Sequence, residues 1–356
     1  MTVDRLEDPI EIAEALIASG RADDAARGLQ ARLMDGRGGL LARLTLIKAL
    51  LVSGNNDGAL AQAREAASLN PGVALAVLAL GETLLAANAL PAAIAELQRA
   101  LRLDPDLVRA RELIAAAWLK AGEADKALEN LHALENPPPE MIAACEAIKS
   151  APRSDPGYVR HLFDQFSTDY DERMIGQLAY AAPQILFDLA AMVMPGREKL
   201  AVLDLGCGTG LAGTVFKLLA ARLDGVDLSP AMIEKARARG IYHDLRVADL
   251  ETALTATGPQ YDLILAADTL VYLGDLTLVF EAASRRLSRD GYFLFTVEKA
   301  EVTGFELGPK RRWRHSEVYL RELAQHFGFG MAGFVAAAPR LEANQPVEGF
   351  AVALTR

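Results

Sequence analysis

The chain has 356 residues, of which 51% are hydrophobic and 24% charged, and its formal net charge is −10. This length predicts two domains, and the near-average composition excludes a disordered or fibrous protein. The negative charge disfavours a nucleic-acid partner, because phosphate binding relies on clustered Lys and Arg. One basic run, formed by Lys310, Arg311, Arg312 and Arg314, is predicted to be a solvated loop.

The apolar runs and the cysteines indicate the cellular setting. Every apolar stretch is interrupted well short of the roughly 18 residues that a membrane helix needs. The N-terminal sequence MTVDRLEDPIE lacks the basic start and apolar core of a signal peptide. We therefore expect no membrane association and a cytoplasmic location. Because Cys145 and Cys207 are the only cysteines and lie far apart, we expect two free thiols and no metal site.

A period of 34 residues runs through the N-terminal half. Gly or Asn at a fixed position ends a helix, and a small Ala lets two helices approach closely. The pattern predicts four helix–turn–helix repeats over about residues 8–139, which must stack to bury their apolar faces. Five series share the period: Pro71, Pro105 and Pro139; Ala25, Ala59, Ala93 and Ala127; Leu16, Leu50, Leu84 and Trp118; Gly20, Gly54, Asn88 and Gly122; Leu29, Ala63, Leu97 and Leu131.

The segment ALGETLLAANALPAAIAELQRALRLDP resembles the tetratricopeptide repeat, with Gly81, Ala93 and Pro105 at signature positions of that family. The flanking repeats depart from the pattern, since Ile47 stands where the family prefers Gly or Ala, and Arg37 where it prefers Pro. Such solenoids present a concave surface that binds peptides or other domains, so we expect a protein or peptide partner. The alternative is a spacer or dimerisation module without a specific ligand.

Residues 136–139 and 151–157 are rich in Pro and mark a boundary, with one helix between them. We predict a repeat domain of residues 1–150 and a second domain of residues 151–356. Beyond Lys199, short β-rich runs alternate with helical segments, which predicts a parallel α/β sheet. The segment before the last strand is too short for a crossover helix and predicts an antiparallel hairpin. The seven predicted strands are 200–205, 222–227, 242–247, 261–267, 291–297, 329–337 and 347–354.

A glycine-rich loop follows the first predicted strand. Gly206, Gly208 and Gly210 occupy its first, third and fifth positions, and Asp204 lies two places ahead. A dinucleotide-binding loop needs glycine at the sixth position, which here is Leu211. The spacing instead resembles the glycine loop of methyltransferases, which implies a loop that holds the methionine part of S-adenosylmethionine against the backbone, and it disfavours a nicotinamide dehydrogenase.

Two acidic residues follow the next strands. Asp227 ends the second strand, where a carboxylate can accept both ribose hydroxyls of a nucleoside. Asp249 follows the third strand and is placed to accept the adenine amino hydrogens, with the N–H of Leu250 available for a ring nitrogen. For both acids the alternative is an ordinary acid at the start of a helix.

Together VLDLGCGTG, VDLS, RVADL and YDLILAADTLVYL resemble the cofactor motifs of class I S-adenosylmethionine-dependent methyltransferases. HLFDQFSTDYDERM resembles the lid helix of small-molecule and carboxyl methyltransferases, which implies that Phe163, Phe166 and Tyr170 cover the cofactor. Packing of these aromatics in a local core is the alternative. The resemblance implies cofactor contacts from Asp204, Gly206, Gly208, Gly210, Asp227, Leu228, Asp249, Leu250, Tyr170 and the carbonyl of Ala267.

Methyl transfer is an in-line displacement at a carbon that the sulfonium already activates, so the protein mainly aligns the reactants and, for some acceptors, removes a proton. Asp268 and Tyr272 follow the fourth strand and can accept or donate a proton. We predict His315 as the general base, because imidazole titrates near neutrality, the alternative being a helix-start residue without chemistry. We also expect Glu298, Arg314 and Tyr319 on the acceptor side of the site, near these residues.

The order of repeats, lid and core resembles a bacterial family of tetratricopeptide-containing methyltransferases. The predicted fold is an α-helical tetratricopeptide-like solenoid followed by an α/β, Rossmann-like, seven-stranded class I methyltransferase domain. The predicted function is transfer of the S-adenosylmethionine methyl group to an oxygen or nitrogen of a small-molecule or protein acceptor, with repeats that recruit substrate or partner. The alternative is a repeat-based interaction protein whose Rossmann-like domain binds the cofactor without catalysis.

Overall fold

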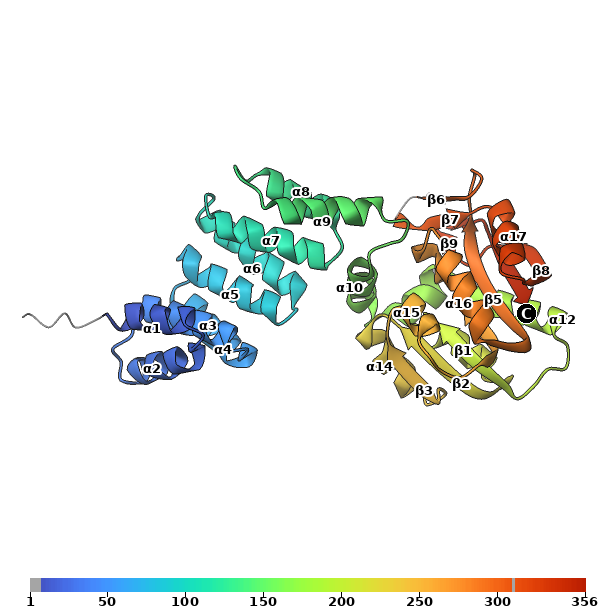
Figure 1. Cartoon of the computed structure of the whole chain (residues 1–356), viewed down its shortest axis with the longest axis horizontal. Helices are drawn as coiled ribbons and strands as arrows, with labels where there is room; N and C mark the ends of the chain where they lie inside the picture. The colour runs from blue at the N-terminus through green and yellow to red at the C-terminus, as the bar shows by residue number, and fades with distance from the viewer. Residues whose placement is uncertain (1–7, 309–310) are drawn as a thin grey trace, which may run out of the picture. The chain divides into compact units, whose positions relative to one another are not determined.

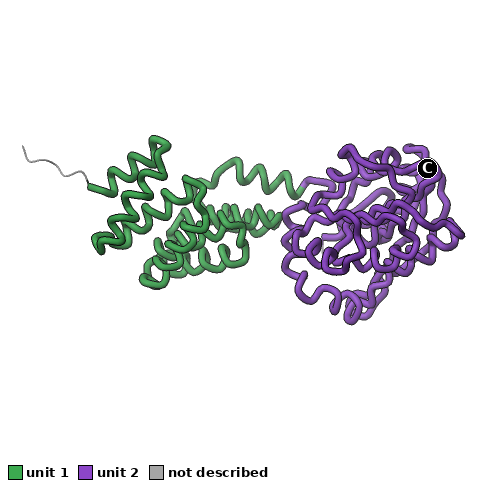
Figure 2. Tube along the Cα trace, turned by 90° about the horizontal axis from the view of Figure 1, so that it is seen from below, with its two compact units in different colours: residues 1–149 green, residues 150–356 purple. Residues whose placement is uncertain are grey.

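The computed structural model describes residues 8–308 and 311–356. The chain divides into two compact units between Lys149 and Ser150 (Figure 2). The acidic start of the chain and Lys310 of the basic run lie outside the described residues. Within the described part, none of the helices has both the length and the apolar character needed to cross a membrane.

The first unit is a stack of helices whose turns follow the predicted period (Figure 1). Gly20, Gly54, Asn88 and Gly122 all have positive φ, between 58° and 80°, at the turn between two helices. The helical repeat architecture is thus confirmed. The helices are α1 (Pro9–Ala18), α2 (Ala22–Met34), α3 (Leu40–Val52), α4 (Asn56–Leu69), α5 (Ala74–Ala86), α6 (Leu90–Leu103), α7 (Val108–Lys120), α8 (Ala124–His132) and α9 (Pro139–Ser150).

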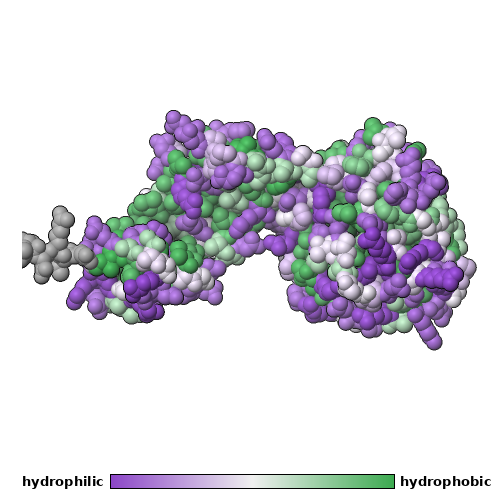
Figure 3. All heavy atoms as spheres, viewed as in Figure 1, coloured by the Kyte–Doolittle hydropathy of each residue, from purple (hydrophilic) through white to green (hydrophobic). Residues whose placement is uncertain are grey.

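Close helix packing in this unit depends on small residues. Ala59 and Ala93 are fully buried. A Cβ added to Gly81 of α5 would lie 2.6 Å from Cγ of Leu97 in α6, so only glycine fits at this crossing. Some large apolar side chains stay exposed, Met34 and Leu69 among them, and apolar patches are visible between the hydrophilic ones in Figure 3.

The second unit is built on a sheet with strand order β3-β2-β1-β4-β5-β11-β8. The first five strands are parallel, and β11 is antiparallel to both of its neighbours. The predicted seven-stranded sheet with a closing hairpin is therefore confirmed. Its strands are β1 (Leu200–Leu205), β2 (Ala220–Asp227), β3 (Asp244–Val247), β4 (Tyr261–Ala266), β5 (Leu287–Lys299), β8 (Gly330–Ala337) and β11 (Gly349–Thr355).

Among the described residues, four further short strands lie outside the predicted set. β6 (Phe305–Leu307) and β7 (Trp313–His315) extend the sheet from the end of β5, and β9 (Leu341–Glu342) pairs with β10 (Gln345–Pro346) between the last two long strands. Two or three residues are too few for an alternating apolar pattern, so the sequence does not indicate them.

Helices cover both faces of the sheet, which explains why its parallel strands are continuous apolar runs. Leu203 and Leu205 face a core formed with α15, α16 and α17, whereas Val202 faces a core formed with α12 and α13. Because β1, β2, β3 and β4 are parallel, their carboxyl ends meet at one edge of the sheet. The helical segments of this unit are α10 (Pro156–Phe166), α11 (Tyr170–Glu172), the π-helix η1 (Arg173–Gln177), α12 (Ala182–Val193), α13 (Leu211–Phe216), α14 (Pro230–Ala238), α15 (Leu250–Thr255), the 3-10 helix η2 (Leu270–Tyr272), α16 (Thr277–Arg286) and α17 (Glu317–His326).

Candidate functional site

A cavity lies at the carboxyl ends of these four strands, the usual place for a ligand in an open α/β sheet. The rest of its wall comes mainly from residues 153–180, ahead of the first strand, together with Arg312. Ten of the predicted site residues line it: Gly206, Gly208, Asp227, Leu228, Asp249, Leu250, Ala267, Asp268, Tyr170 and Tyr272.

The glycine loop forms the floor of the cavity. A Cβ on Gly206 would lie 2.3 Å from Cγ2 of Thr269, and φ is +66° at this residue, so a larger side chain is excluded twice over. A Cβ on Gly208 would meet no atom within 4 Å, although φ is +55° there. The backbone at Gly208 is therefore open to a ligand.

The carboxylate of Asp227 is held by the main chain. Its Oδ2 accepts a hydrogen bond from the Gly208 N–H at 2.8 Å, and its Oδ1 accepts one from the Ser229 N–H at 2.8 Å. Burial raises the pKa of Asp227 to about 6, against the effect of these hydrogen bonds. Each oxygen keeps a second lone pair, so the group can still accept hydrogen bonds from a ligand in the cavity.

Asp249 combines two roles. Its Oδ1 caps α15 by accepting hydrogen bonds from the N–H groups of Glu251 (3.1 Å) and Thr252 (3.4 Å). This matches the alternative interpretation of Asp249 as an acid at the start of a helix. Its Oδ2 accepts a hydrogen bond from Nη2 of Arg153 at 2.5 Å. Arg153 also lines the cavity and pairs with Glu251. The predicted contact of Asp249 with adenine stays a prediction.

Aromatic side chains close the cavity on the side of α10 and α11. Phe163 meets Tyr170 and Tyr272 edge to face, with ring centroids 6.0 Å and 5.6 Å apart, and all three line the cavity, as does Phe166. Burial raises the pKa values of Tyr170 and Tyr272, so both phenols are neutral hydrogen-bond donors at neutral pH. Asp171 accepts a hydrogen bond from Thr209 and pairs with Arg239, which fastens this segment to the glycine loop.

Family models match two parts of the chain. Residues 203–293 match a model described as a methyltransferase domain, and residues 44–108 match one described as a tetratricopeptide repeat. This chain carries a methyltransferase domain behind tetratricopeptide repeats. The prediction of these two families is confirmed.

Several characterised proteins are similar to parts of the methyltransferase domain. Methyltransferase-like protein 27 of Homo sapiens is 34% identical over 113 residues, which are 31% of this chain and 46% of that protein. A ubiquinone biosynthesis O-methyltransferase of Bartonella quintana is 31% identical over 106 residues, 29% of this chain and 43% of that protein. The matches thus span less than half the length of these relatives.

Two solved structures are similar to part of this chain. Magnesium protoporphyrin IX methyltransferase from Synechocystis, crystallised with bound SAM, has a TM-score of 0.43 and 20% identity, and the match covers 57% of this chain and 97% of that one. The 1,6-didemethyltoxoflavin-N1-methyltransferase of Burkholderia thailandensis has a TM-score of 0.45 and 19% identity, with 58% and 92% covered.

Two of the predicted cofactor contacts, Asp204 and Gly210, do not line the cavity, and their role stays a prediction. Asp204 is 1% exposed and its Oδ2 accepts a hydrogen bond from Tyr242 at 2.6 Å, while burial raises its pKa to about 7. Gly210 precedes α13, and a Cβ there would lie 3.0 Å from the side chains of Arg239 and Tyr242. Asp204 and Gly210 therefore pack against Tyr242 beside the glycine loop.

The position of His315 contradicts its predicted role as general base. It is 0% exposed and does not line the cavity, because β7 pairs with β5 and places the ring inside the domain. Its Nε2 lies 3.0 Å from the Gly274 carbonyl oxygen, and its ring stacks on Tyr319. Burial lowers the pKa of His315 to about 4, so it is a neutral core residue.

The other side chains expected on the acceptor side of the site lie elsewhere. Tyr319 donates a hydrogen bond to Asp275, and Arg314 pairs with Glu298 at 3.6 Å, but none of Glu298, Arg314 and Tyr319 lines the cavity. Arg312, two residues before Arg314, lines it instead. The basic run is therefore partly built into the site, contrary to the expectation of a solvated loop.

Sequence reasoning missed four site residues. Arg153 and Arg312 line the cavity. Tyr180 lines it too, and its hydroxyl donates a hydrogen bond to the Ala267 carbonyl at 3.1 Å, the atom predicted to contact the cofactor. Arg340 pairs with Asp268 from behind the cavity wall. Arg153, Tyr180 and Arg340 belong to no motif, so no local signal was present to find them, whereas Arg312 lies in the basic run that was interpreted as a solvated loop.

Proposed function

We propose that this protein is an S-adenosylmethionine-dependent methyltransferase that methylates an oxygen or nitrogen of a small-molecule or protein acceptor. The observation that carries the proposal is the carboxylate of Asp227, which the main chain holds in place. It lines a cavity together with Gly208, Asp249 and the aromatic side chains of the lid. These groups complement a ligand in which a nucleoside with both ribose hydroxyls free is linked to an amino acid.

The lining fits the cofactor part by part. The open backbone at Gly208 suits the methionine part, and the free lone pairs of Asp227 suit the two ribose hydroxyls. Leu228 and Leu250 offer apolar surface to the adenine ring. Each part of the cofactor therefore has a matching group in the cavity.

The cofactor supplies a methyl group on a sulfonium. The chain's own residues then have to align the acceptor and exclude water, which the ring cluster of Phe163, Tyr170 and Tyr272 does by covering the cavity. Asp268 is the lining carboxylate that can take the proton of a hydroxyl or ammonium acceptor, and Tyr272 can donate a hydrogen bond to it.

The repeats are proposed to recruit the acceptor or a partner protein. Their stacked helices provide a continuous surface, and a recruiting domain raises the local concentration of a macromolecular acceptor without touching the chemistry.

Calorimetric titration of the purified full-length protein tests the cofactor assignment. We expect binding of S-adenosylmethionine and S-adenosylhomocysteine but not of NAD. Binding of NAD with no binding of the sulfonium compound would overturn the proposal. The non-catalytic alternative is tested by incubating the protein with methyl-labelled cofactor and a cell extract: transfer of label that is lost in Asp268→Asn supports catalysis, and binding without any transfer supports the alternative.

A further inference from the structure

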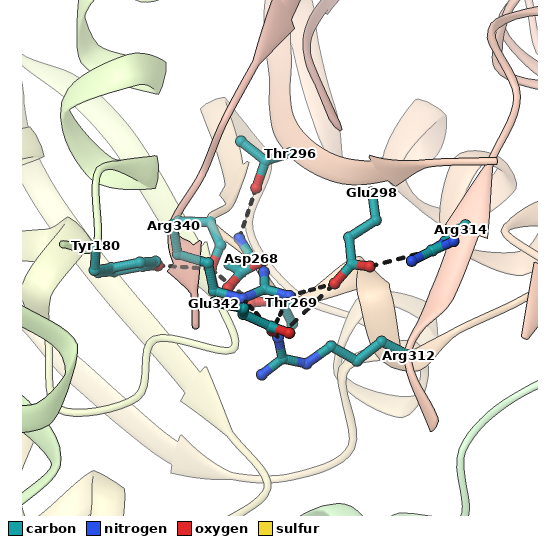
Figure 4. A network of polar contacts seen from close by, with 10 residues as sticks. Tyr180, Asp268, Thr269, Thr296, Glu298, Arg312, Arg314, Arg340 and Glu342 are labelled. Carbon is teal, nitrogen blue, oxygen red and sulfur yellow. Dashed lines mark hydrogen bonds and ion pairs between the residues drawn. The ribbon is translucent and has the colours of Figure 1, made fainter. Parts of the chain in front are cut away.

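Arg340 is a buried guanidinium at the centre of a charged network behind the cavity (Figure 4). It is 1% exposed and pairs with Asp268, with Glu298 at the end of β5 and with Glu342 in β9. Of these three carboxylates, only that of Asp268 lines the cavity. Arg340 therefore reaches the site through Asp268 and does not touch a ligand itself.

The backbone on both sides of Arg340 is anchored. The Pro339 carbonyl accepts hydrogen bonds from the N–H groups of Ala181 (2.8 Å) and Ala182 (3.1 Å), and the Leu341 N–H donates to the Leu178 carbonyl at 2.7 Å. Leu178 itself lines the cavity. The guanidinium is thus held at a fixed place relative to the cavity wall.

Asp268 lies beside the glycine loop that the proposed function assigns to the methionine part of the cofactor. It precedes Thr269, whose side chain packs against Gly206, and its own N–H donates a hydrogen bond to Oγ1 of Thr296 at 2.8 Å. Its φ is +58°, a conformation that Asp adopts more readily than most residues. The carboxylate is therefore close to the reacting end of the cavity.

The charges around Asp268 oppose one another. Burial raises its pKa, Arg340 and Arg312 act to lower it, and Glu298 raises it again. Three tyrosine hydroxyls from separate segments, those of Tyr170, Tyr180 and Tyr272, also interact with Asp268, and Glu342 of the same network pairs with Arg340. Since burial alone would favour the neutral acid, the arginine contact is what favours the carboxylate.

We propose that Arg340 is a positioning residue that keeps Asp268 ionised beside the sulfonium of the bound cofactor, so that the site prefers the charged methyl donor to its neutral product. This inference rests on the proposed function. Transfer of the methyl group breaks the carbon–sulfur bond, and the electron pair stays on sulfur. The sulfur then loses its positive charge, and with it the attraction to Asp268, which favours exchange of S-adenosylhomocysteine for fresh donor.

The ratio of the affinities for S-adenosylmethionine and S-adenosylhomocysteine reports this preference without any methyl acceptor. The two ligands share the ribose and adenine, so titration of Asp227 cancels in the ratio. We expect the full-length protein to prefer the donor at neutral pH and to lose this preference on acidification. In Arg340→Met the loss should occur at higher pH, and the ratio at pH 7 should fall about fivefold or more.

Two further arginine variants serve as controls. Arg340→Lys keeps the charge and should retain most of the preference. Arg314→Met removes an arginine of the same network that pairs with Glu298 and does not line the cavity, and it should leave the ratio unchanged. A purely structural role of Arg340 would instead lower both affinities together.

Asp268→Asn tests the inference even if Arg340→Met fails to fold, because it keeps the size of the side chain and removes the charge. The inference requires a lower ratio that no longer depends on pH. A wild-type ratio in folded Asp268→Asn, or an unchanged pH dependence in folded Arg340→Met, would overturn it. Failure of the wild-type protein to bind either ligand would instead refute the proposed function on which the inference rests.

Discussion

Replacing Asp227 with Asn is expected to weaken S-adenosylmethionine binding at least tenfold. Both carboxylate oxygens accept a backbone N–H at 2.8 Å, from Gly208 and from Ser229. Asparagine has only one acceptor oxygen and no charge, so a ribose hydroxyl that faces its NH₂ group would lose a charge-assisted hydrogen bond of about 1.5 to 3 kcal/mol. Because about 1.4 kcal/mol corresponds to a tenfold change in affinity, the loss of this one ribose contact accounts for the expected effect.

The carboxylate of Asp227 should also make cofactor affinity and protein stability depend on pH. Burial raises the pKa of Asp227 to about 6, and the ribose hydroxyls need the ionised form as acceptor. The wild-type affinity should therefore fall as the pH is lowered through about 6, and Asp227→Asn should lack this inflection. For stability the sign is opposite: the folded protein holds the proton between pH 3.8 and about 6, so this contribution to stability is present at low pH and is lost as the pH rises through that window.

Calorimetric titration between pH 5 and 8 measures the effect, and thermal unfolding confirms that the variant is folded. Asp224→Asn is the matched control, because Asp224 is a buried acid of the same strand that does not line the cavity. The reasoning is refuted if folded Asp227→Asn binds the cofactor with wild-type affinity, or if both variants lose affinity equally.

Three further outcomes are expected. His315→Gln should lower stability by about 1 to 3 kcal/mol at pH 7 without changing cofactor affinity. Because the pKa of His315 is lowered to about 4, the unfolded wild-type chain takes the proton first, and wild-type stability should fall between pH 6.5 and 4, a dependence absent from the variant in thermal unfolding. Gly81→Ala should lower the melting temperature of the repeat unit, since overpacking costs about 1 to 3 kcal/mol, while cofactor affinity in calorimetry stays unchanged. Residues 151–356 produced alone should be soluble and bind the cofactor with full-length affinity, and an insoluble product or lost binding would show that the repeats are needed for the site.

The repeats and the sheet were predictable because their signals are local and periodic. The 34-residue period places a turn at Gly20 and again at Gly54, and both turns are present. The long strands carry continuous apolar runs, since both faces of the sheet are covered. The glycine loop and Asp227 were found because their spacing along the chain resembles the cofactor motifs of class I methyltransferases.

The amino-acid sequence by itself thus determined the order of the domains, the helical period, the seven long strands and the residues of the glycine loop. Only the tertiary structure decided which charges meet at the cavity. Arg153 pairs with Asp249 across 96 residues, and Arg340 with Asp268 across 72. It also decided that His315 is buried, since the three-residue strand β7 pairs with the end of β5. The physical reason is that burial and charge pairing depend on packing between segments distant in the chain, which no local pattern records.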